Sequence, residues 1–154
     1  MIYKQFIQEY EARGMIKKQR ADVRAMGRLI RRALKEIEIA KLNLAIDEGT
    51  AYTVTYTAML HAARAFMLLK GYRPSDGYQH KTVVDFTEVA LGAKYKTVIQ
   101  HFDKMRRKRN LFTYELTISI SPTEAKSALK TAKEFVDLIR GIIEEENPQA
   151  EFKF

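Results

Sequence analysis

The sequence predicts an all-α fold, an antiparallel up-and-down bundle of four to five helices. Only 7 glycines and 3 prolines interrupt 154 residues, which indicates long helices with few turns. Several segments repeat apolar residues at helical spacing, whereas the strand-like residues 117–120 are too isolated to build a sheet. We expect one domain over residues 1–154, with its core over 22–145, an N-terminal extension over 1–21 and a short polar tail over 147–154.

The first strong helical segment is predicted from about Asp22 to Ala45, with a short helix over residues 3–13 as an optional element before it. Projected at 100° per residue, its apolar side chains fall on one arc and its basic side chains on the opposite arc. Two interpretations of the basic arc stay open, an ordinary solvated face or an anion-binding surface. The basic residues are Arg20, Arg24, Arg28, Arg31, Arg32 and Lys35.

The second helix is predicted to start near residues 47–50 and to end at Lys70, where Gly71 suits the residue after a helix. It is apolar nearly all round, which is typical of a central, buried helix. Its many alanines would allow neighbouring helices to approach closely. Residues 72–77 are predicted to form a loop, and a short helix is expected over residues 80–91.

Two further helices complete the predicted bundle. One runs from about Lys94 towards Tyr114 and combines an apolar stripe with a basic end. The last begins at the sequence Ser121-Pro122-Thr123-Glu124, which combines a capping box with a proline at the first helical position. It ends in three consecutive glutamates, residues 144–146.

Positive charge is concentrated in two segments of the chain. The sequence has 27 Lys and Arg against 19 Asp and Glu, a net charge of +8. Residues 1–45 carry 11 basic and 5 acidic side chains, and residues 92–110 carry 7 and 1. Clustering of this kind favours a polyanionic partner over a general role in solubility.

Other classes of protein are disfavoured by composition. No apolar run approaches the roughly 20 residues of a membrane helix, and the basic helix needs its apolar face for the core, so we expect no membrane partner. The N-terminal residues lack the apolar stretch of a signal peptide, which makes the cytoplasm the expected location. Cysteine is absent, so disulfides and thiolate chemistry are excluded.

No metal or cofactor motif is visible. The three histidines His61, His80 and His101 do not have the spacing of metal ligands, and no glycine-rich phosphate loop occurs. His61 lies in the apolar helix and His80 opens a helix, so we interpret both as structural residues with a satisfied hydrogen bond. His101 lies close to the basic end of its helix and is a candidate for phosphate chemistry.

The run of residues 105–115 is the most informative local feature. Arg106 and Arg109 are three residues apart and share a helix face, which is suited to phosphate oxygens. Asn110 adds an amide, and Tyr114 adds a phenol that could stack on a base. The alternative is a network of ion pairs with Asp47, Glu48 or Asp85 on neighbouring helices.

Five features follow one another along residues 22–145. They are the amphipathic first helix, the helix AYTVTYTAMLHAARAFMLLKGY, His80-Lys81 before Val84-Asp85-Phe86, the block Arg109-Asn110…Tyr114-Glu115, and the capped helix SPTEAKSALKTAKEFVDLIR. This ordered set resembles the HEPN superfamily, small α-helical domains found beside minimal nucleotidyltransferases and in many ribonuclease toxins. The resemblance implies a homodimer in which two copies of an Arg-x4–6-His motif face one cleft and, in active members, cleave RNA without a metal.

One position departs from that motif. Arg109 and Asn110 match it, but Tyr114 stands five residues later, where the resemblance places the catalytic histidine. A tyrosine with the ordinary pKa near 10 is ionised in only about one molecule in a thousand at pH 7, so it is a poor general base. Positions five apart on a straight helix also diverge, so the helix would have to end or bend near Leu111 to bring them together.

Three functions are therefore compatible with the sequence. The first is an RNA- or nucleotide-binding protein that is the partner of a minimal nucleotidyltransferase in a toxin–antitoxin-like system. The second is a metal-independent endoribonuclease that uses Arg109 with Tyr114 or His101. The third is a protein–protein interaction module that binds an acidic partner. The residues predicted to bind RNA or phosphate are Arg106, Arg109, Asn110, Arg24, Arg28 and Arg31.

Overall fold

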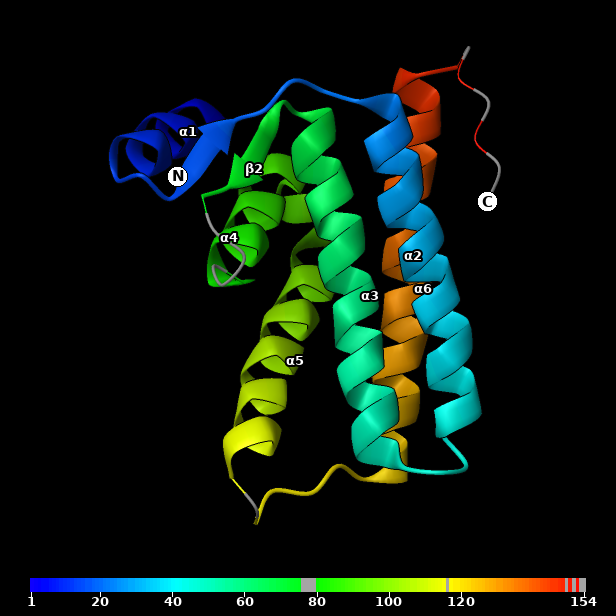
Figure 1. The fold of residues 1–154 in the computed structure, drawn as a ribbon. Helices are drawn as coiled ribbons and strands as arrows, with labels where there is room; N and C mark the ends of the chain where they lie inside the picture. The colour runs from blue at the N-terminus through cyan, green and yellow to red at the C-terminus, as the bar shows by residue number, and fades with distance from the viewer. Residues whose placement is uncertain (76–79, 116, 149, 151, 153–154) are drawn as a thin grey trace.

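The computed structural model describes residues 1–75, 80–115, 117–148, 150 and 152. These residues form six α-helices, one short 3-10 helix and one two-stranded sheet (Figure 1). In chain order the elements are α1 (Tyr3–Ala12), β1 (Ile16–Lys18), α2 (Val23–Asn43), α3 (Glu48–Leu69), β2 (Tyr72–Pro74), α4 (His80–Leu91), η1 (Ala93–Tyr95), α5 (Lys96–Tyr114) and α6 (Pro122–Glu146).

Helix α3 is the centre of the bundle. Helices α2 and α6 pack against one side of it, and α4 and α5 pack against the other (Figure 1). The long helices α2, α3, α5 and α6 alternate in direction, which confirms the predicted antiparallel up-and-down bundle. Fourteen of the 22 residues of α3 are buried, because an apolar helix in water is stable only when other elements cover all its faces.

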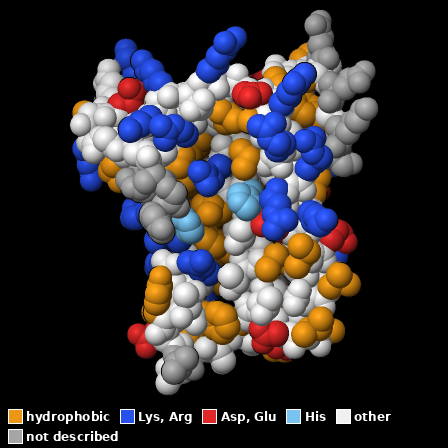
Figure 2. All heavy atoms as spheres, viewed as in Figure 1, with side chains coloured by type: hydrophobic (Ala, Val, Ile, Leu, Met, Phe, Trp, Pro, Cys, Tyr) orange, Lys and Arg blue, Asp and Glu red, His pale blue; other side chains and the backbone are white. Residues whose placement is uncertain are grey.

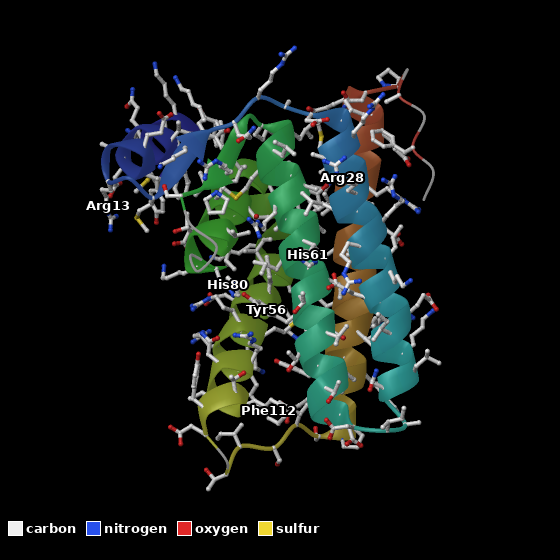
Figure 3. All side chains as sticks on the ribbon, viewed as in Figure 1. Arg13, Arg28, Tyr56, His61, His80 and Phe112 are labelled. Atoms are coloured by element: carbon white, nitrogen blue, oxygen red, sulfur yellow. The ribbon has the colours of Figure 1, made fainter. Side chains whose placement is uncertain are left out.

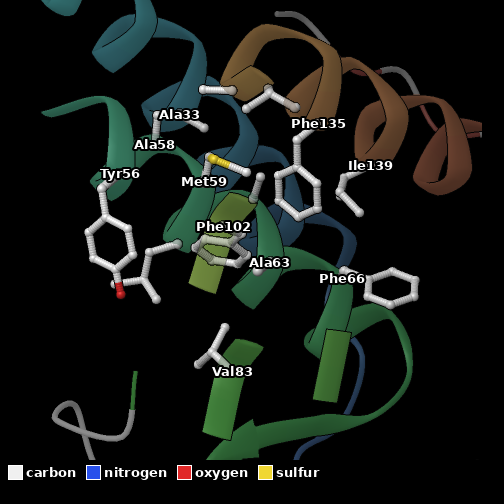
Figure 4. Packing of buried hydrophobic residues seen from close by; sticks show 14 of the residues in the cluster. Ala33, Tyr56, Ala58, Met59, Ala63, Phe66, Val83, Phe102, Phe135 and Ile139 are labelled. Atoms are coloured by element: carbon white, nitrogen blue, oxygen red, sulfur yellow. The ribbon is translucent and has the colours of Figure 1, made fainter. Parts of the chain in front are cut away.

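Aromatic and alanine side chains fill the core around α3 (Figure 4). The Phe102 ring lies 5.8 Å from the Tyr56 ring and 5.5 Å from the Phe135 ring, measured between centroids. These contacts connect α3, α5 and α6. Ala58, Ala62 and other α3 alanines are fully buried, so neighbouring helices can approach α3 closely, as predicted.

The helix ends follow the predicted capping signals. The Asp22 side chain accepts hydrogen bonds from two backbone amides at the start of α2. The Asp47 side chain accepts one from the backbone amide of Thr50 at the start of α3. Ser121 and Glu124 form the complete capping box of α6. Gly71 has a φ of +87°, a conformation that favours glycine directly after α3.

A short strand pairing departs from the sequence-based expectations. The sequence predicts a loop over residues 72–77, but residues 72–74 form β2, which pairs antiparallel with β1 and places Lys17 opposite Arg73. Residues 76 and 77 of that prediction lie outside the described residues. The pairing joins segments more than 50 residues apart, so no local pattern indicates it.

Among the described residues there are six α-helices, one more than the four or five of the predicted bundle. The additional one, α1, agrees with the optional short helix expected over residues 3–13. The added helix α1 buries Phe6 and Ile7 in the core.

The end of α5 is held against the start of α3 by one close contact. A Cβ atom built on Gly49 would lie 2.2 Å from Cζ of the Phe112 ring. The ring therefore occupies the space that any larger residue at position 49 would need. This contact fixes the helical turn of α5 that carries Arg109.

We expect Gly49→Ala to lower the free energy of unfolding by about 1–3 kcal/mol, because overpacking forces Phe112 and the end of α5 to move. Chemical denaturation monitored by circular dichroism measures the change. Gly141→Ala in α6 is the matched control, since a Cβ there meets nothing within 4 Å. The control should gain up to about 1 kcal/mol from helix propensity. Equal stabilities of the two variants would contradict the packing at Gly49.

Candidate functional site

Helices α4 and α5 border an open hollow of about 450 Å³. Helix α5 contributes Arg106, Arg109, Asn110 and Tyr114 to its lining, and the first turn of α4 contributes His80 with its two following residues. Met15, just before β1, completes the wall. We call this region the Arg109 hollow. It brings together four of the residues that the sequence analysis selected and adds His80, which it had interpreted as structural.

Arg109 has an unusual environment for a partly buried cation. Its Nη1 donates a hydrogen bond to Asn110 Oδ1 at 3.3 Å. Its Nε is buried and has no partner among the described residues, and no ion pair found among them includes Arg109. Buried donors without a partner are uncommon and often mark functional sites. The Arg109 charge is thus available to an anion in the hollow.

The other cations of the run are only partly neutralised. Arg106 Nη2 lies 2.9 Å from Asp103 Oδ1, and Arg107 Nε lies 3.2 Å from the other oxygen of the same carboxylate. Lys108 pairs with Glu124 of α6 at 3.2 Å. One carboxylate shared by two arginines leaves excess positive charge, which suits phosphate.

The predicted alternative, in which the arginines of this run pair with Asp47, Glu48 or Asp85 of neighbouring helices, is wrong in the carboxylates that it names. Asp47 caps α3, and Asp85 accepts hydrogen bonds from Tyr10 and Lys81. Neither of these two carboxylates, nor Glu48, forms an ion pair with an arginine of α5 among the described residues. The arginine partner is instead Asp103, one turn away on the same helix, where i,i+3 and i,i+4 side chains meet.

His80 is held in the hollow by Tyr56. The Tyr56 hydroxyl and His80 Nδ1 are 3.0 Å apart, and the two residues lie on the α4 side of α3 (Figure 3). Burial raises the pKa of Tyr56 above its ordinary value, so its hydroxyl keeps its proton. The roles in this contact depend on the tautomer of the ring, and we infer the arrangement in which Tyr56 donates to Nδ1. The neutral ring then carries its proton on Nε2, as a hydrogen-bond donor.

The surroundings of His80 disfavour its charged form. Burial, followed by the positive charges of Arg109 and two further arginines, lowers the pKa of His80 below its ordinary value of about 6.5. A neutral donor beside two arginines is suited to binding an anion. The hydrogen bond with Tyr56 agrees with the structural interpretation of His80 from the sequence, whereas its position beside Arg109 has no local signal in the sequence.

Tyr114 and His101 occupy different positions relative to Arg109. Tyr114 is the last residue of α5 and lies at the open edge of the hollow with 79% of its surface exposed. Helix α5 continues through Leu111 to Tyr114, without the earlier end that would bring Tyr114 close to Arg109. His101 instead donates to or accepts from Thr131 Oγ1 at 2.8 Å and lines a separate hollow between α5 and α6.

The basic side chains of α2 form a second surface. Arg24, Arg28 and Arg31 are exposed on α2 and do not line the Arg109 hollow. Figure 3 shows Arg28 on the far side of α3 from His80. In Figure 2, lysine and arginine side chains border the hollowed region in which histidine is visible. The two basic segments of the sequence therefore flank one face of the bundle.

Neither metal sites nor membrane helices are found in the part of the chain that the structure describes. No group of three or more His, Asp or Glu side chains there could hold a metal ion. None of the described helices is long and apolar enough to cross a membrane.

We expect the free energy of unfolding to decrease as the pH falls below about 6.5. The pKa values of His80 and His101 are lowered in the folded state, mainly by burial, so the unfolded chain binds protons more readily. The stability is present above the unfolded pKa and is lost as the pH falls through the folded values. Urea unfolding between pH 7.5 and 5, roughly spanning this range, measures the decrease.

His80→Gln should weaken this pH dependence, because glutamine does not titrate. NMR of the histidine ring protons provides an independent measurement of the His80 pKa. A midpoint at or above the ordinary value would contradict the buried environment of this ring.

Comparison with known proteins gives one result for this chain. The family model described as HEPN domain matches residues 26–142. That range includes all of α3, α4 and α5, and with them Tyr56, His80 and Arg109. A search of curated proteins finds no match.

Proposed function

Because this chain belongs to the HEPN domain family, we propose that it binds RNA or a nucleotide through the Arg109 hollow. Membership of the family supports a nucleotide- or RNA-related function in general. The observation that carries the proposal is the environment of Arg109, whose charge has no acidic partner among the described residues and whose Nε is buried without a hydrogen bond. Arg106 and the Nε2–H of His80 would donate to the same phosphate group.

We also propose a setting for this binding. The resemblance of the chain to proteins found beside minimal nucleotidyltransferases supports a partner of that class in a toxin–antitoxin-like system in the cytoplasm. A homodimer is supported by exposed apolar side chains near the C-terminal ends of α2 and α5. These side chains are Leu42, Ile46, Leu111 and Tyr114. Both helix ends lie at the same end of the bundle (Figure 1).

The basic surface of α2 would extend the contact beyond the hollow. Arg24, Arg28 and Arg31 are exposed and would contact neighbouring phosphates of a longer strand. Each cation that neutralises a phosphate of a single strand contributes about 0.7 to the slope of log affinity against log salt concentration. The phosphate contacts of the Arg109 hollow and those of the α2 surface can therefore be counted separately, from the salt slopes of the corresponding variants.

We expect Arg109→Gln to weaken binding of a fluorescein-labelled single-stranded RNA about tenfold, because a hydrogen bond to a charged group contributes about 1.5–3 kcal/mol. Its salt slope should decrease by about 0.7. The matched control is Arg140→Gln, which removes an arginine of α6 outside the hollow. Fluorescence anisotropy at several salt concentrations measures both quantities.

The triple variant Arg24→Gln/Arg28→Gln/Arg31→Gln should reduce the slope further without altering the effect of Arg109→Gln. RNA affinity that does not depend on salt, or that is equal in the wild type and Arg109→Gln, would refute the proposal.

The endoribonuclease remains the second candidate, because the hollow places a histidine beside Arg109. Cleavage would need His80 to accept a proton from a 2′-hydroxyl. With Tyr56 donating to Nδ1, the other ring nitrogen carries a proton and cannot accept one. The hydrogen bond of Tyr56 therefore favours binding over cleavage, and the exposed Tyr114 does not supply the missing base.

We expect RNA incubated with the purified protein and EDTA to remain intact. Denaturing gel electrophoresis checks this, with Arg109→Gln and His80→Gln assayed in parallel with the wild type. Cleavage that disappears in either variant would replace the binding proposal by the nuclease. Cleavage that is equal in all three proteins would indicate a contaminating enzyme.

A further inference from the structure

A second cavity lies across α3 from the Arg109 hollow. It is open to solvent, has a volume of about 340 Å³ and is bordered by the first half of α2, the second half of α3 and strand β2. This volume lies within the range of roughly 300–1,000 Å³ that is usual for small-ligand sites. None of the residues selected from the sequence as site residues lines it. We call it the His61 cavity.

A buried carboxylate fixes the histidine of this cavity. Glu36 of α2 is only 3% exposed, and its Oε1 lies 2.6 Å from His61 Nδ1. Its other oxygen lies 3.4 Å from Arg32 Nε. A buried charge is costly unless it is paired in this way. Because Nδ1 donates to the carboxylate, the ring has one orientation, and Nε2 is the atom left for the cavity.

Two arginines add positive charge to the same cavity. Arg64 lies one helical turn after His61 on α3, and Arg73 lies on β2. The positive charge of Arg64 also helps to lower the pKa of His80, so Arg64 lines this cavity and acts electrostatically on the other site. Arg73 Nη1 donates to the backbone oxygen of Pro74 at 3.3 Å, which holds its guanidinium at the cavity wall.

The remaining wall is apolar and includes an aromatic ring. Leu29 of α2, Leu68 of α3 and Tyr72 of β2 line it. Polar side chains suited to the edge of a base, Gln19 and Asp22, lie at the same cavity. A ligand that fits both parts has a flat or apolar body joined to an anion. A nucleobase with its phosphate is such a ligand, since bases stack on aromatic side chains.

We propose that the His61 cavity is a second subsite that binds one nucleotide of the RNA. Arg64 and Arg73 bind its phosphate, His61 Nε2 accepts a hydrogen bond from a sugar hydroxyl, and the wall of Leu29, Leu68 and Tyr72 receives its base. This inference rests on the proposed function, because the strand that enters the cavity also contacts the Arg109 hollow. Arg64 lines the cavity and its charge also acts on His80, so it would contact the strand on its way from one site to the other.

The test measures nucleotide and RNA binding in the same set of variants. Isothermal titration calorimetry with AMP reports on the His61 cavity, and fluorescence anisotropy with labelled single-stranded RNA reports on the whole path. His61→Gln removes the ring but keeps an amide donor for Glu36. Ala25→Met leaves all charges in place and fills the cavity from α2, so it tests the site even if His61→Gln does not fold. Arg140→Gln is the control.

We expect each of the two cavity variants to weaken AMP binding at least tenfold and RNA binding severalfold. Arg109→Gln should weaken RNA binding and any AMP binding in the Arg109 hollow, but leave the AMP site that the two cavity variants weaken within twofold. Inorganic phosphate should compete poorly with AMP, because it lacks the base.

Three results would overturn the inference. They are no saturable AMP binding at millimolar concentration, AMP affinity unchanged in both cavity variants, and AMP binding that is lost in Arg109→Gln instead. In each case RNA binding that still depends on Arg109 would leave the proposed function in place. RNA binding that depends on neither site would refute both the proposed function and the inference about the His61 cavity.

Discussion

The burial of α3 on all sides is the constraint from which the rest of the arrangement follows. An apolar helix of 22 residues needs neighbours around its whole circumference, and α2, α6, α4 and α5 supply them. Those neighbours bury their own apolar faces on α3 and must therefore turn their charged faces outward. Three polar side chains of α3, Tyr56, His61 and Arg64, lie at the seams between its neighbours. Both sites described above are such seams.

Electrostatic imbalance distinguishes these seams from ordinary helix contacts. In an average surface network each cation has its own carboxylate and contributes little to stability. Here Asp103 serves two arginines and Glu36 serves a histidine and an arginine, while Arg109 has none among the described residues. The exposed arginines among them contribute little to stability, whereas the partners of buried Glu36 offset the cost of its burial. Their arrangement is more economically explained by an anionic ligand that completes the pairing.

The helices and their caps could be predicted from the sequence, because their determinants are local. The capping box at Ser121 and the apolar character of α3 each act within a few residues of chain. The sheet could not be predicted, since its strands are three residues long and distant in sequence. Part of the Arg109 site was predictable from the charge run, whereas the role of His80 was not. That role depends on Tyr56, 24 residues earlier, and is decided only when α3 and α4 pack together.

The short pairing of β1 with β2 bears on where this domain begins. The family match starts at residue 26, yet the ribbon and its flanks reach both sites, with Met15 in one and Gln19 in the other. Tyr10 is also hydrogen-bonded to Asp85 of α4. A chain shortened to the family boundary would retain the long helices but lose one wall of each site and leave the edge of β2 unpaired. The range of the family match is therefore smaller than the part of the chain that lines the two proposed sites.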